Sequence, residues 1–432
     1  MNIEDNELLD EICKIPVIDT HEHLTWDESE WAGSKNDVLG EYLSQYLKSD
    51  VISAGLKLND YEKVIDANRN IMERWKIVEP FWEYSRHTGY GRALDISVRQ
   101  IYGIDGINGS TIEALNSAFL ANKIPGHYKR VLQEICNIEI SLDDIWILPG
   151  EEASSFFKFI WQPNDFILPG ESNKGGELLP HIEKSCNIKI NCLDDWLGAL
   201  ETQLNYVLDF YKVKVIKSAI AYSRTLRFEK TEYSIAKTMF SEAMKAWDKG
   251  LRKAPLVFPS ALEDYIMHSV LSLANKRNLT FQFHTGILEG NGNILSNSDP
   301  SLLNNLFLEY PDLDFDIFHI GYPYQGIVCA MAKMFPNVFI DMCWAHIVSP
   351  AASIAALEDF LDAVPYNKIS AFGGDYGFVD GVYGHLYLSR LNTCNVLMKK
   401  IKSGIFNEEK ALEIARALYY DNPKRIFKLG KK

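Results

Sequence analysis

After residue 136, short runs of apolar and β-branched residues alternate with longer segments in which apolar residues recur at helical spacing. Neighbouring residues of a strand point to opposite faces, whereas positions three and four apart share a face of a helix. Including one run near the N-terminus, strands are predicted at about 15–20, 144–148, 156–160, 213–219, 279–284, 314–319, 337–341 and 369–373. Helices are predicted between most of them, at 193–211, 231–252, 260–277, 300–310, 325–335 and 351–363.

This alternation predicts an α/β fold, because strands separated by helices pair in parallel through right-handed crossovers. Eight strands are the number that closes a (β/α)8 TIM barrel. The stretch 150–190 shows the alternation of strands and helices least clearly, since it mixes strand-like runs with Pro-Gly turns. Residues 2–14 are predicted to form a short amphipathic helix, and 381–428 are predicted to be helical and to pack outside the barrel.

The alternation is absent between residues 26 and 135, where helical patterns rich in aromatic residues take its place. Tyr42, Tyr46, Leu47 and Val51, for example, recur at helical spacing. We therefore predict a barrel made of residues 1–25 and 136–432, with 26–135 as a helical insertion or cap packed on it.

Composition narrows the class of protein. The chain has 432 residues and a formal net charge of −14, which argues against a nucleic-acid surface because such a surface is basic. No run approaches the roughly 20 apolar residues of a membrane span, and the acidic N-terminus lacks the apolar core of a secretion signal. The seven cysteines include no Cys-x-x-Cys pair and are interpreted as buried thiols in a reducing compartment. A cytoplasmic protein is expected.

Two histidines stand at the end of the first predicted strand. His21 and His23 lie two residues apart, so both imidazoles can face one point, and imidazole is the commonest metal ligand. Glu22 between them points to the opposite face and is excluded as a ligand. A His-x-His motif alone is only a hypothesis, because a strand-end histidine is more often a satisfied polar residue.

Three further strands end in the same way. The runs ending in His284-Thr285-Gly286, His319-Ile320-Gly321 and Asp375-Tyr376-Gly377 each place a His or Asp at a strand end, with a glycine two residues later. Barrel enzymes carry their catalytic groups at the carboxyl ends of strands. The joint occurrence favours a shared site. Other histidines lie outside this pattern: His127, His181, His268 and His385.

The order of these residues resembles the amidohydrolase superfamily of metal-dependent barrels, which carries His-x-His on strand one, His on strands five and six, and Asp on strand eight. Several longer pieces resemble the barrel domain fused to glutamine synthetase in nodulin-type proteins. They are 217–222 with Arg224, 284–286, 319–323 and 369–375. The helical insertion is similar to that of uronate isomerase relatives.

The resemblance implies one divalent ion, most readily Zn, with Mn or Fe also suited to the ligands. The implied metal ligands are His21, His23, His284 and Asp375. Asp375 would also act as general base toward water, and His319 would polarise a substrate carbonyl or shuttle a proton. Lys217 stands where binuclear members carry a carboxylated lysine, so two ions are an alternative. Lys217 would otherwise contact a substrate carboxylate or pair with an acid.

Substrate-binding roles are predicted for Lys217, Tyr222, Arg224, Arg86, Arg92 and Tyr322. The stretch Arg86–Arg92 holds two arginines beside two glycines, and an arginine there would bind an anionic substrate with two hydrogen bonds. The alternative is a turn with solvated charges, and Tyr322 beside Pro323 is equally consistent with a packing residue.

The function expected is metal-dependent hydrolysis of an amide, lactone or related C–N or C–O bond in a small substrate that carries a carboxylate. A metal-dependent decarboxylase or a uronate-type isomerase on the same site is the first alternative. A non-catalytic barrel module is the second, although the complete ligand set argues against it. Besides the small-molecule substrate, the expected partner is a second copy of the chain in a homo-oligomer, with neither nucleic acid nor membrane.

Overall fold

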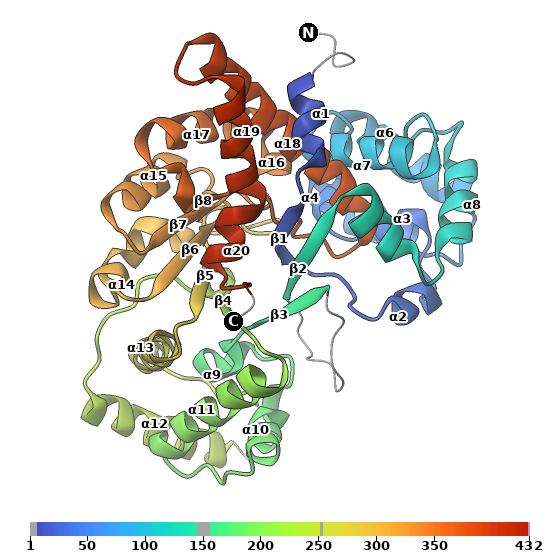
Figure 1. Ribbon diagram of the computed structural model, residues 1–432. Helices are drawn as coiled ribbons and strands as arrows, with labels where there is room; N and C mark the ends of the chain where they lie inside the picture. The colour runs from blue at the N-terminus through green and yellow to red at the C-terminus, as the bar shows by residue number, and fades with distance from the viewer. Residues whose placement is uncertain (1–6, 145–155, 251–253, 431–432) are drawn as a thin grey trace.

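Eight parallel strands form the centre of the computed structural model, which describes residues 7–144, 156–250 and 254–430 (Figure 1). Each strand pairs with the next one along the chain. The strands are β1 (Val17–Glu22), β2 (Ile138–Asp144), β3 (Phe157–Trp161), β4 (Val215–Ser218), β5 (Thr280–His284), β6 (Asp314–Phe318), β7 (Val338–Asp341) and β8 (Ile369–Ser370).

Backbone hydrogen bonds join the last strand to the first. The N–H of Thr20 donates to the carbonyl of Phe372 at 3.1 Å, and the N–H of Asp375 donates to the carbonyl of His21 at 2.7 Å. These bonds lie just beyond the two regular residues of β8, so the short strand is continued by extended chain. The predicted (β/α)8 TIM barrel is thereby confirmed.

The six helices predicted between strands are present. They are α11 (Leu193–Phe210), α12 (Tyr233–Lys249), α13 (Ser260–Lys276), α14 (Asn304–Glu309), α15 (Gln325–Met334) and α17 (Pro350–Ala363). The α-helix of the 300–310 segment begins only at Asn304, because Pro300–Leu303 form a 3-10 turn first. The unclear stretch 150–190 contributes β3, α9 (Asn164–Ile167) and α10 (Leu178–Cys186).

The terminal segments are helical, as predicted. In the N-terminal segment 2–14, α1 (Glu7–Lys14) is described, and residues 2–6 lie outside the described part. The C-terminal segment forms three α-helices, namely α18 (Val379–Lys402), α19 (Glu408–Arg416) and α20 (Asn422–Ile426).

The second strand begins earlier than predicted. β2 starts at Ile138, and its apolar residues Ile138, Ile140 and Leu142 alternate with polar ones before the strand ends at Asp144. The predicted run 144–148 therefore shares only one residue with β2, and 145–148 lie outside the described residues. The acidic residues within 138–144 mask a strand signal that is otherwise regular.

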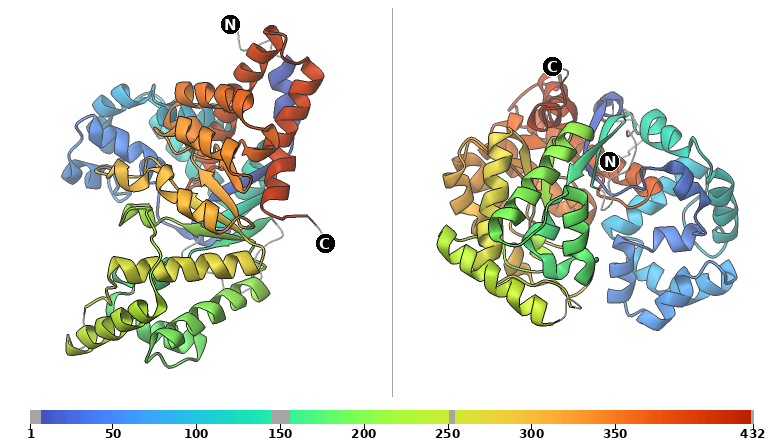
Figure 2. Two further views of the ribbon diagram at one scale, coloured as in Figure 1. Left: turned by 90° about the vertical axis from the view of Figure 1, so that its left-hand side faces the viewer. Right: turned by 90° about the horizontal axis from the view of Figure 1, so that it is seen from below.

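The segment between β1 and β2 is helical, in agreement with its aromatic helical pattern. It forms α2 (Glu28–Gly33), α3 (Val38–Tyr42), α4 (Tyr46–Ser53), α5 (Leu58–Ile65), α6 (Ile71–Ser85), α7 (Gly89–Tyr102) and α8 (Ile112–Asn122). These helices gather on one side of the barrel, away from α9–α13 (Figure 2). The division into barrel and insertion stays a prediction.

One contact fixes this helical segment closely against the barrel. At Gly384 in α18, an added Cβ would lie 1.8 Å from the carbonyl oxygen of Ala93 in α7, so glycine lets the two helix backbones approach. Among the described residues, no helix is both long and apolar enough to cross a membrane.

Candidate metal centre

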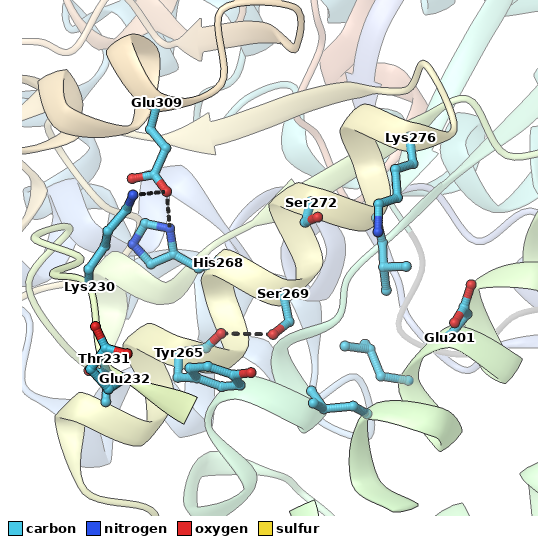
Figure 3. A pocket seen from close by; sticks show the side chains of 13 residues that line it. Glu201, Lys230, Thr231, Glu232, Tyr265, His268, Ser269, Ser272, Lys276 and Glu309 are labelled. Carbon is cyan, nitrogen blue, oxygen red and sulfur yellow. Dashed lines mark hydrogen bonds and ion pairs between the residues drawn. The ribbon is translucent and has the colours of Figure 1, made fainter. Parts of the chain in front are cut away.

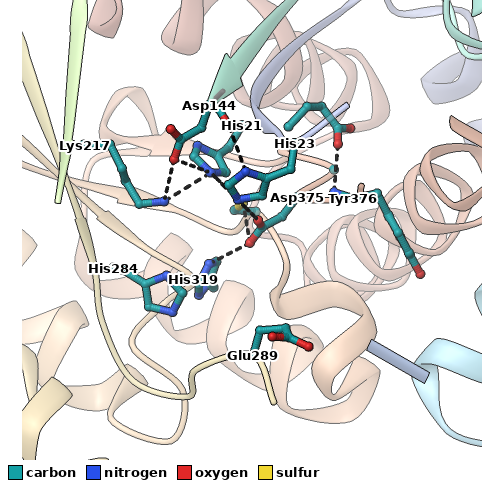
Figure 4. Close-up of polar contacts among 12 residues, drawn as sticks. His21, His23, Asp144, Lys217, His284, Glu289, His319, Asp375 and Tyr376 are labelled. Atoms are coloured by element: carbon teal, nitrogen blue, oxygen red, sulfur yellow. Dashed lines mark hydrogen bonds and ion pairs between the residues drawn. The ribbon is translucent and has the colours of Figure 1, made fainter. Parts of the chain in front are cut away.

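His21 and His23 come together at the carboxyl end of β1 (Figure 4). Their Nε2 atoms are 3.3 Å apart, and His21 is fully buried. The Nδ1 of His23 lies 2.9 Å from the carbonyl oxygen of Asp144, to which it can donate its proton. That hydrogen bond leaves Nε2 of His23 with a free lone pair, the arrangement that metal-ligating histidines adopt.

Asp375 enters the same point from the chain that follows β8. Its Oδ1 is 3.3 Å from Nε2 of His23 and 3.8 Å from Nε2 of His21. Its Oδ2 faces the other way and lies 2.9 Å from Nε2 of His319. The two oxygens of this carboxylate thus contact two different groups of side chains.

The backbone of Asp375 is held from both sides. Its φ angle of 56° is in the left-handed region, which Asp tolerates better than most residues. Its carbonyl oxygen accepts hydrogen bonds from Tyr46 Oη and from Gln45 Nε2, the latter at 3.0 Å. The helical segment after β1 therefore positions the loop that carries the carboxylate.

Gly374 and Glu22 also help to position the chain that carries Asp375. An added Cβ at Gly374 would lie 1.6 Å from Oε1 of Glu22, so only glycine fits beside that carboxyl group. Oε2 of Glu22 accepts from the N–H of Tyr376 at 2.8 Å. Glu22 thus contacts the chain after β8 rather than the histidine Nε2 atoms.

Two charged residues that border His21 make the centre larger than the sequence pattern indicates. Asp144, which was not predicted, ends β2 with its Oδ2 3.6 Å from Nε2 of His21. Lys217 on β4 places Nζ 3.1 Å from the same nitrogen and 3.7 Å from Asp144 Oδ2. Its ammonium also lies 4.1 Å from the ring centre of Phe318. The signal for Asp144 was the acidic end of the alternating run 138–144.

The donor atoms fit a divalent ion. Nε2 of His21, Nε2 of His23 and Oδ1 of Asp375 are separated by 3.3 to 3.8 Å. Ligand atoms about 2.0–2.2 Å from a tetrahedral ion lie roughly 3.3–3.6 Å from one another. His21, His23 and Asp144 also form a group whose donor atoms all lie within 4.8 Å. A divalent ion placed between these donor atoms would therefore lie at ligand distance from them.

The protonation states of His21 and Asp375 agree with a metal site, whereas burial of His23 is outweighed by contacts with Asp375 and Asp144, which raise its pKa. Burial first, and Lys217 second, hold the pKa of His21 well below its usual value, so its imidazole is neutral. Burial would raise the pKa of Asp375, but its contacts with His23 and His319 hold that pKa well below the usual value. Burial also lowers the pKa of Lys217. Neutral imidazole and ionised carboxylate are the forms that bind metal ions.

His284 lies beside the centre but not among these donor atoms. Its ring centre is 4.4 Å from that of His319, and its Nε2 is 3.1 Å from the carbonyl oxygen of Ile287. Tyr222 packs its ring 5.1 Å from that of His284, and its Oη accepts from the N–H of Glu289 at 2.9 Å. The ligand role of His284 and the substrate role of Tyr222 stay predictions.

The contacts of Arg86, Arg224 and Tyr322 lie outside the centre. Arg224 pairs with Glu263 at 2.8 Å and Asp264 at 2.6 Å, while Arg86 lies 3.3 Å from Glu83 and 3.6 Å from Asp95. Tyr322 is half-buried, and its carbonyl oxygen accepts from the N–H of Ile287. Arg92 is an exposed residue of α7. Their substrate roles stay predictions.

A separate hollow of about 420 Å³ lies on the outer helices (Figure 3). Its lining includes His268, whose Nδ1 is 3.0 Å from Tyr310 Oη, and Lys230, which pairs with Glu309 at 2.9 Å. These side chains already neutralise one another. The convergence of several histidines and acids at the strand ends makes that place, and not the outer hollow, the candidate site.

Comparison with known proteins agrees with this geometry. Residues 247–429 match the family model described as Amidohydrolase (Amidohydro_2). Protein fluG of Emericella nidulans is 24% identical over 220 residues, which are 50% of this chain and 25% of that protein. The chain thus spans about a quarter of the length of this relative.

Two solved structures are similar over nearly the whole chain. A uronate isomerase from Thermotoga maritima has a TM-score of 0.78 at 16% identity, with 97% of this chain and 96% of that chain covered. A candidate metal-dependent hydrolase from Lactobacillus casei ATCC 334 has a TM-score of 0.65 at 14% identity, with 98% of each chain covered. These two structures share the barrel fold of this chain, and the match of residues 247–429 to the Amidohydrolase family model supports the resemblance to the amidohydrolase superfamily.

Proposed function

We propose that the protein is a metal-dependent hydrolase that cleaves an amide, lactone or related C–N or C–O bond of a small, carboxylate-bearing substrate. The observation that carries this proposal is the position of Asp375, whose Oδ1 faces His21 and His23 while its Oδ2 faces His319. A carboxylate in this position can accept a proton on one side of the site and pass it to an imidazole on the other.

The ion would be held by His21, His23 and Asp375, with His284 and Asp144 as the nearest further ligands. Zn is the first expectation, and Mn or Fe would also suit nitrogen and oxygen ligands. A divalent ion there supplies Lewis-acid chemistry, which lowers the pKa of water to about 7 and polarises a carbonyl oxygen.

The side chains would divide the proton transfers among them. Asp375 would take the proton from the attacking water, and His319 would polarise the scissile carbonyl or protonate the leaving group. Burial lowers the pKa of His319, so the imidazole is neutral at rest and needs the proton from Asp375 before it can act as an acid. Lys217 would attract a substrate carboxylate toward the centre, because its ammonium is buried there with Asp144 as its ion-pair partner at 3.7 Å.

A uronate-type isomerase is the second candidate. It is supported by the similarity to a uronate isomerase over 97% of the chain, including the helical segment after β1. In that reaction Asp375 or His319 would move a proton between neighbouring carbons of a sugar acid, and no water would enter the product.

A substrate panel in ¹⁸O-labelled water separates the candidates. The protein, supplied with Zn, Mn or Fe, would be given acylated amino acids, lactones, uronates and aromatic acids, with Asp375→Asn as the matched control. Hydrolysis predicts one ¹⁸O atom in the acid product. An aldose-to-ketose conversion would support the isomerase, and release of carbon dioxide would reject hydrolysis. No turnover with any metal or substrate class would count against both candidates.

A further inference from the structure

A second group of metal-ligating side chains lies on the far side of Asp375. Cys343 follows β7, is fully buried, and places its Sγ 4.0 Å from Oδ2 of Asp375. Nε2 of His319 is 2.9 Å from the same oxygen. The donor atoms of these three residues all lie within 4.8 Å of one another. The sequence pattern did not single out Cys343.

Hydrogen bonding accounts for only part of this group, since the thiol of Cys343 can donate to Oδ2 of Asp375 at 4.0 Å. Both ring nitrogens of His319 are buried and, among the described residues, neither has an aligned hydrogen-bond partner, although Asp375 Oδ2 is close. Buried polar atoms are normally paired, and each exception needs an explanation such as an ion. A cation between the nitrogen, the sulfur and the carboxylate oxygen would satisfy all three.

The thiol is held in place by its surroundings. The N–H of Cys343 donates to Oδ1 of Asp341 at 2.9 Å, which anchors its backbone to the end of β7. At Gly373 an added Cβ would lie 2.8 Å from Sγ, so that glycine leaves the space which the sulfur occupies. The ring of Trp344 stands perpendicular to that of His319 at 5.0 Å and limits how far the imidazole can turn.

We propose that His319, Cys343 and Asp375 form a second cation site, which takes a divalent metal ion of borderline softness such as Zn(II) or Co(II). Thiolate and imidazole ligands select such ions over Mg²⁺ or Ca²⁺. On binding, the S–H bond breaks, the sulfur binds the metal, and the proton passes to solvent. Asp375 would then bridge two ions, with Oδ1 toward His21 and His23 and Oδ2 toward this site.

This assignment differs from a second ion held by a carboxylated Lys217, because Lys217 borders His21 and Asp144 rather than Cys343. The inference rests on the proposed function in one respect, since both place a cation beside Asp375. With the second site filled, His319 would act as a metal ligand and would no longer carry the proton from Oδ2 of Asp375. It makes the separate claim that sulfur is a ligand, and that claim can be measured without substrate.

Titration of the metal-free full-length protein with Co(II) tests the proposal. We expect two equivalents to bind and one of them to show a thiolate-to-cobalt charge-transfer band. Cys343→Ser should abolish the band and weaken that equivalent by more than about 100-fold, because loss of even an outer partner costs about 10- to 100-fold. Cys136→Ser, which removes another fully buried thiol, should keep the band and both equivalents.

The outcomes separate this inference from the proposed function. One equivalent without a charge-transfer band would overturn the second site and leave the first standing, whereas no bound metal would overturn both. Loss of the second equivalent in Lys217→Met but not in Cys343→Ser would also overturn it. If Cys343→Ser fails to fold, X-ray absorption of the zinc-loaded wild type decides, since the site requires a sulfur about 2.3 Å from the metal.

Discussion

Two buried carboxylates, Asp375 and Asp380, are five residues apart in the chain and have opposite environments. Asp380 in α18 is 1% exposed and accepts three hydrogen bonds, from Tyr42 Oη at 2.7 Å, Tyr102 Oη at 2.7 Å and His127 Nε2 at 2.8 Å. These donors come from the helical segment between β1 and β2. In each of these contacts a donor faces an acceptor, so the three hydrogen bonds need no further partner. They join that helical segment to α18 of the barrel.

Asp375 is surrounded by the imidazole nitrogens of three histidines, whose donor or acceptor roles depend on their tautomers. Two Nε2 atoms face each other at 3.3 Å, and His319 contacts the carboxylate without an aligned hydrogen bond among the described residues. Burial and charge are similar in the two clusters. The difference is complementarity, and it teaches that a buried cluster whose lone pairs converge is arranged for a ligand, whereas a complementary one is arranged for stability.

The largest expected effect is the loss of activity in Asp375→Asn. Because an amide cannot accept the proton from water, we expect kcat/KM to fall about 10²- to 10⁴-fold, the usual contribution of general base catalysis. The folded structure should persist, as judged by circular dichroism. Steady-state kinetics with the substrate identified by the panel measure the change, and retained turnover would contradict the role of Asp375 as base.

The converse is expected for Asp380→Asn. The substitution leaves buried donors without a carboxylate acceptor, which costs about 1–3 kcal/mol per unsatisfied group, so the free energy of unfolding should fall by at least that amount. Metal binding at the strand ends should remain in the fraction that is folded. Urea denaturation measures the change, and a variant as stable as the wild type would erase the contrast between the two clusters.

Metal addition should stabilise the wild type and leave Asp375→Asn nearly unaffected. An ion that binds only the folded state adds about 2.7 kcal/mol at 100 times its Kd. Thermal unfolding of metal-free protein with increasing Zn, Mn or Co follows this effect. Equal stabilisation of both proteins would mean that the ion binds elsewhere.

The smallest expected effect is a change in the stability difference between wild type and Asp380→Asn at acidic pH. Burial opposes ionisation of Asp380, but its contacts with His127 and the two tyrosines hold its pKa below the ordinary 3.8. A carboxylate with a lowered folded pKa stabilises fully above the unfolded value and loses this contribution as pH falls through the folded pKa. The stability difference between wild type and Asp380→Asn should therefore shrink below about pH 4. A difference that grows in acid would contradict this sign.

The sequence predicted the barrel because strands and helices alternate, and it predicted the site because four of the apolar strands stop at a His or Asp, which is a local signal. The number of strands and the six intervening helices followed from the same periodicity. Asp144 was missed because acidic residues interrupt the strand signal of 138–144. Cys343 was missed because a lone cysteine carries no pattern, and its meaning depends on Asp375, which is 32 residues away.

The Asp380 cluster could not be predicted for a different reason. Its partner His127 is 253 residues distant, and the contact depends on how the segment that follows α8 packs against α18. Such pairing depends on the tertiary structure, and the local pattern of apolar and polar residues contains no information about it. The same holds for Tyr46 and Gln45, which fix the backbone of Asp375 from the opposite end of the chain.

The metal content of gently purified protein tests the central claim most directly. Elemental analysis of the wild type beside His21→Ala, with His127→Gln as a matched buried histidine outside the site, compares the two clusters. We predict at least one equivalent of Zn, Mn or Fe in the wild type and in His127→Gln, and little in His21→Ala. Wild-type protein that carries no metal and binds none when Zn, Mn or Fe is added would contradict the account.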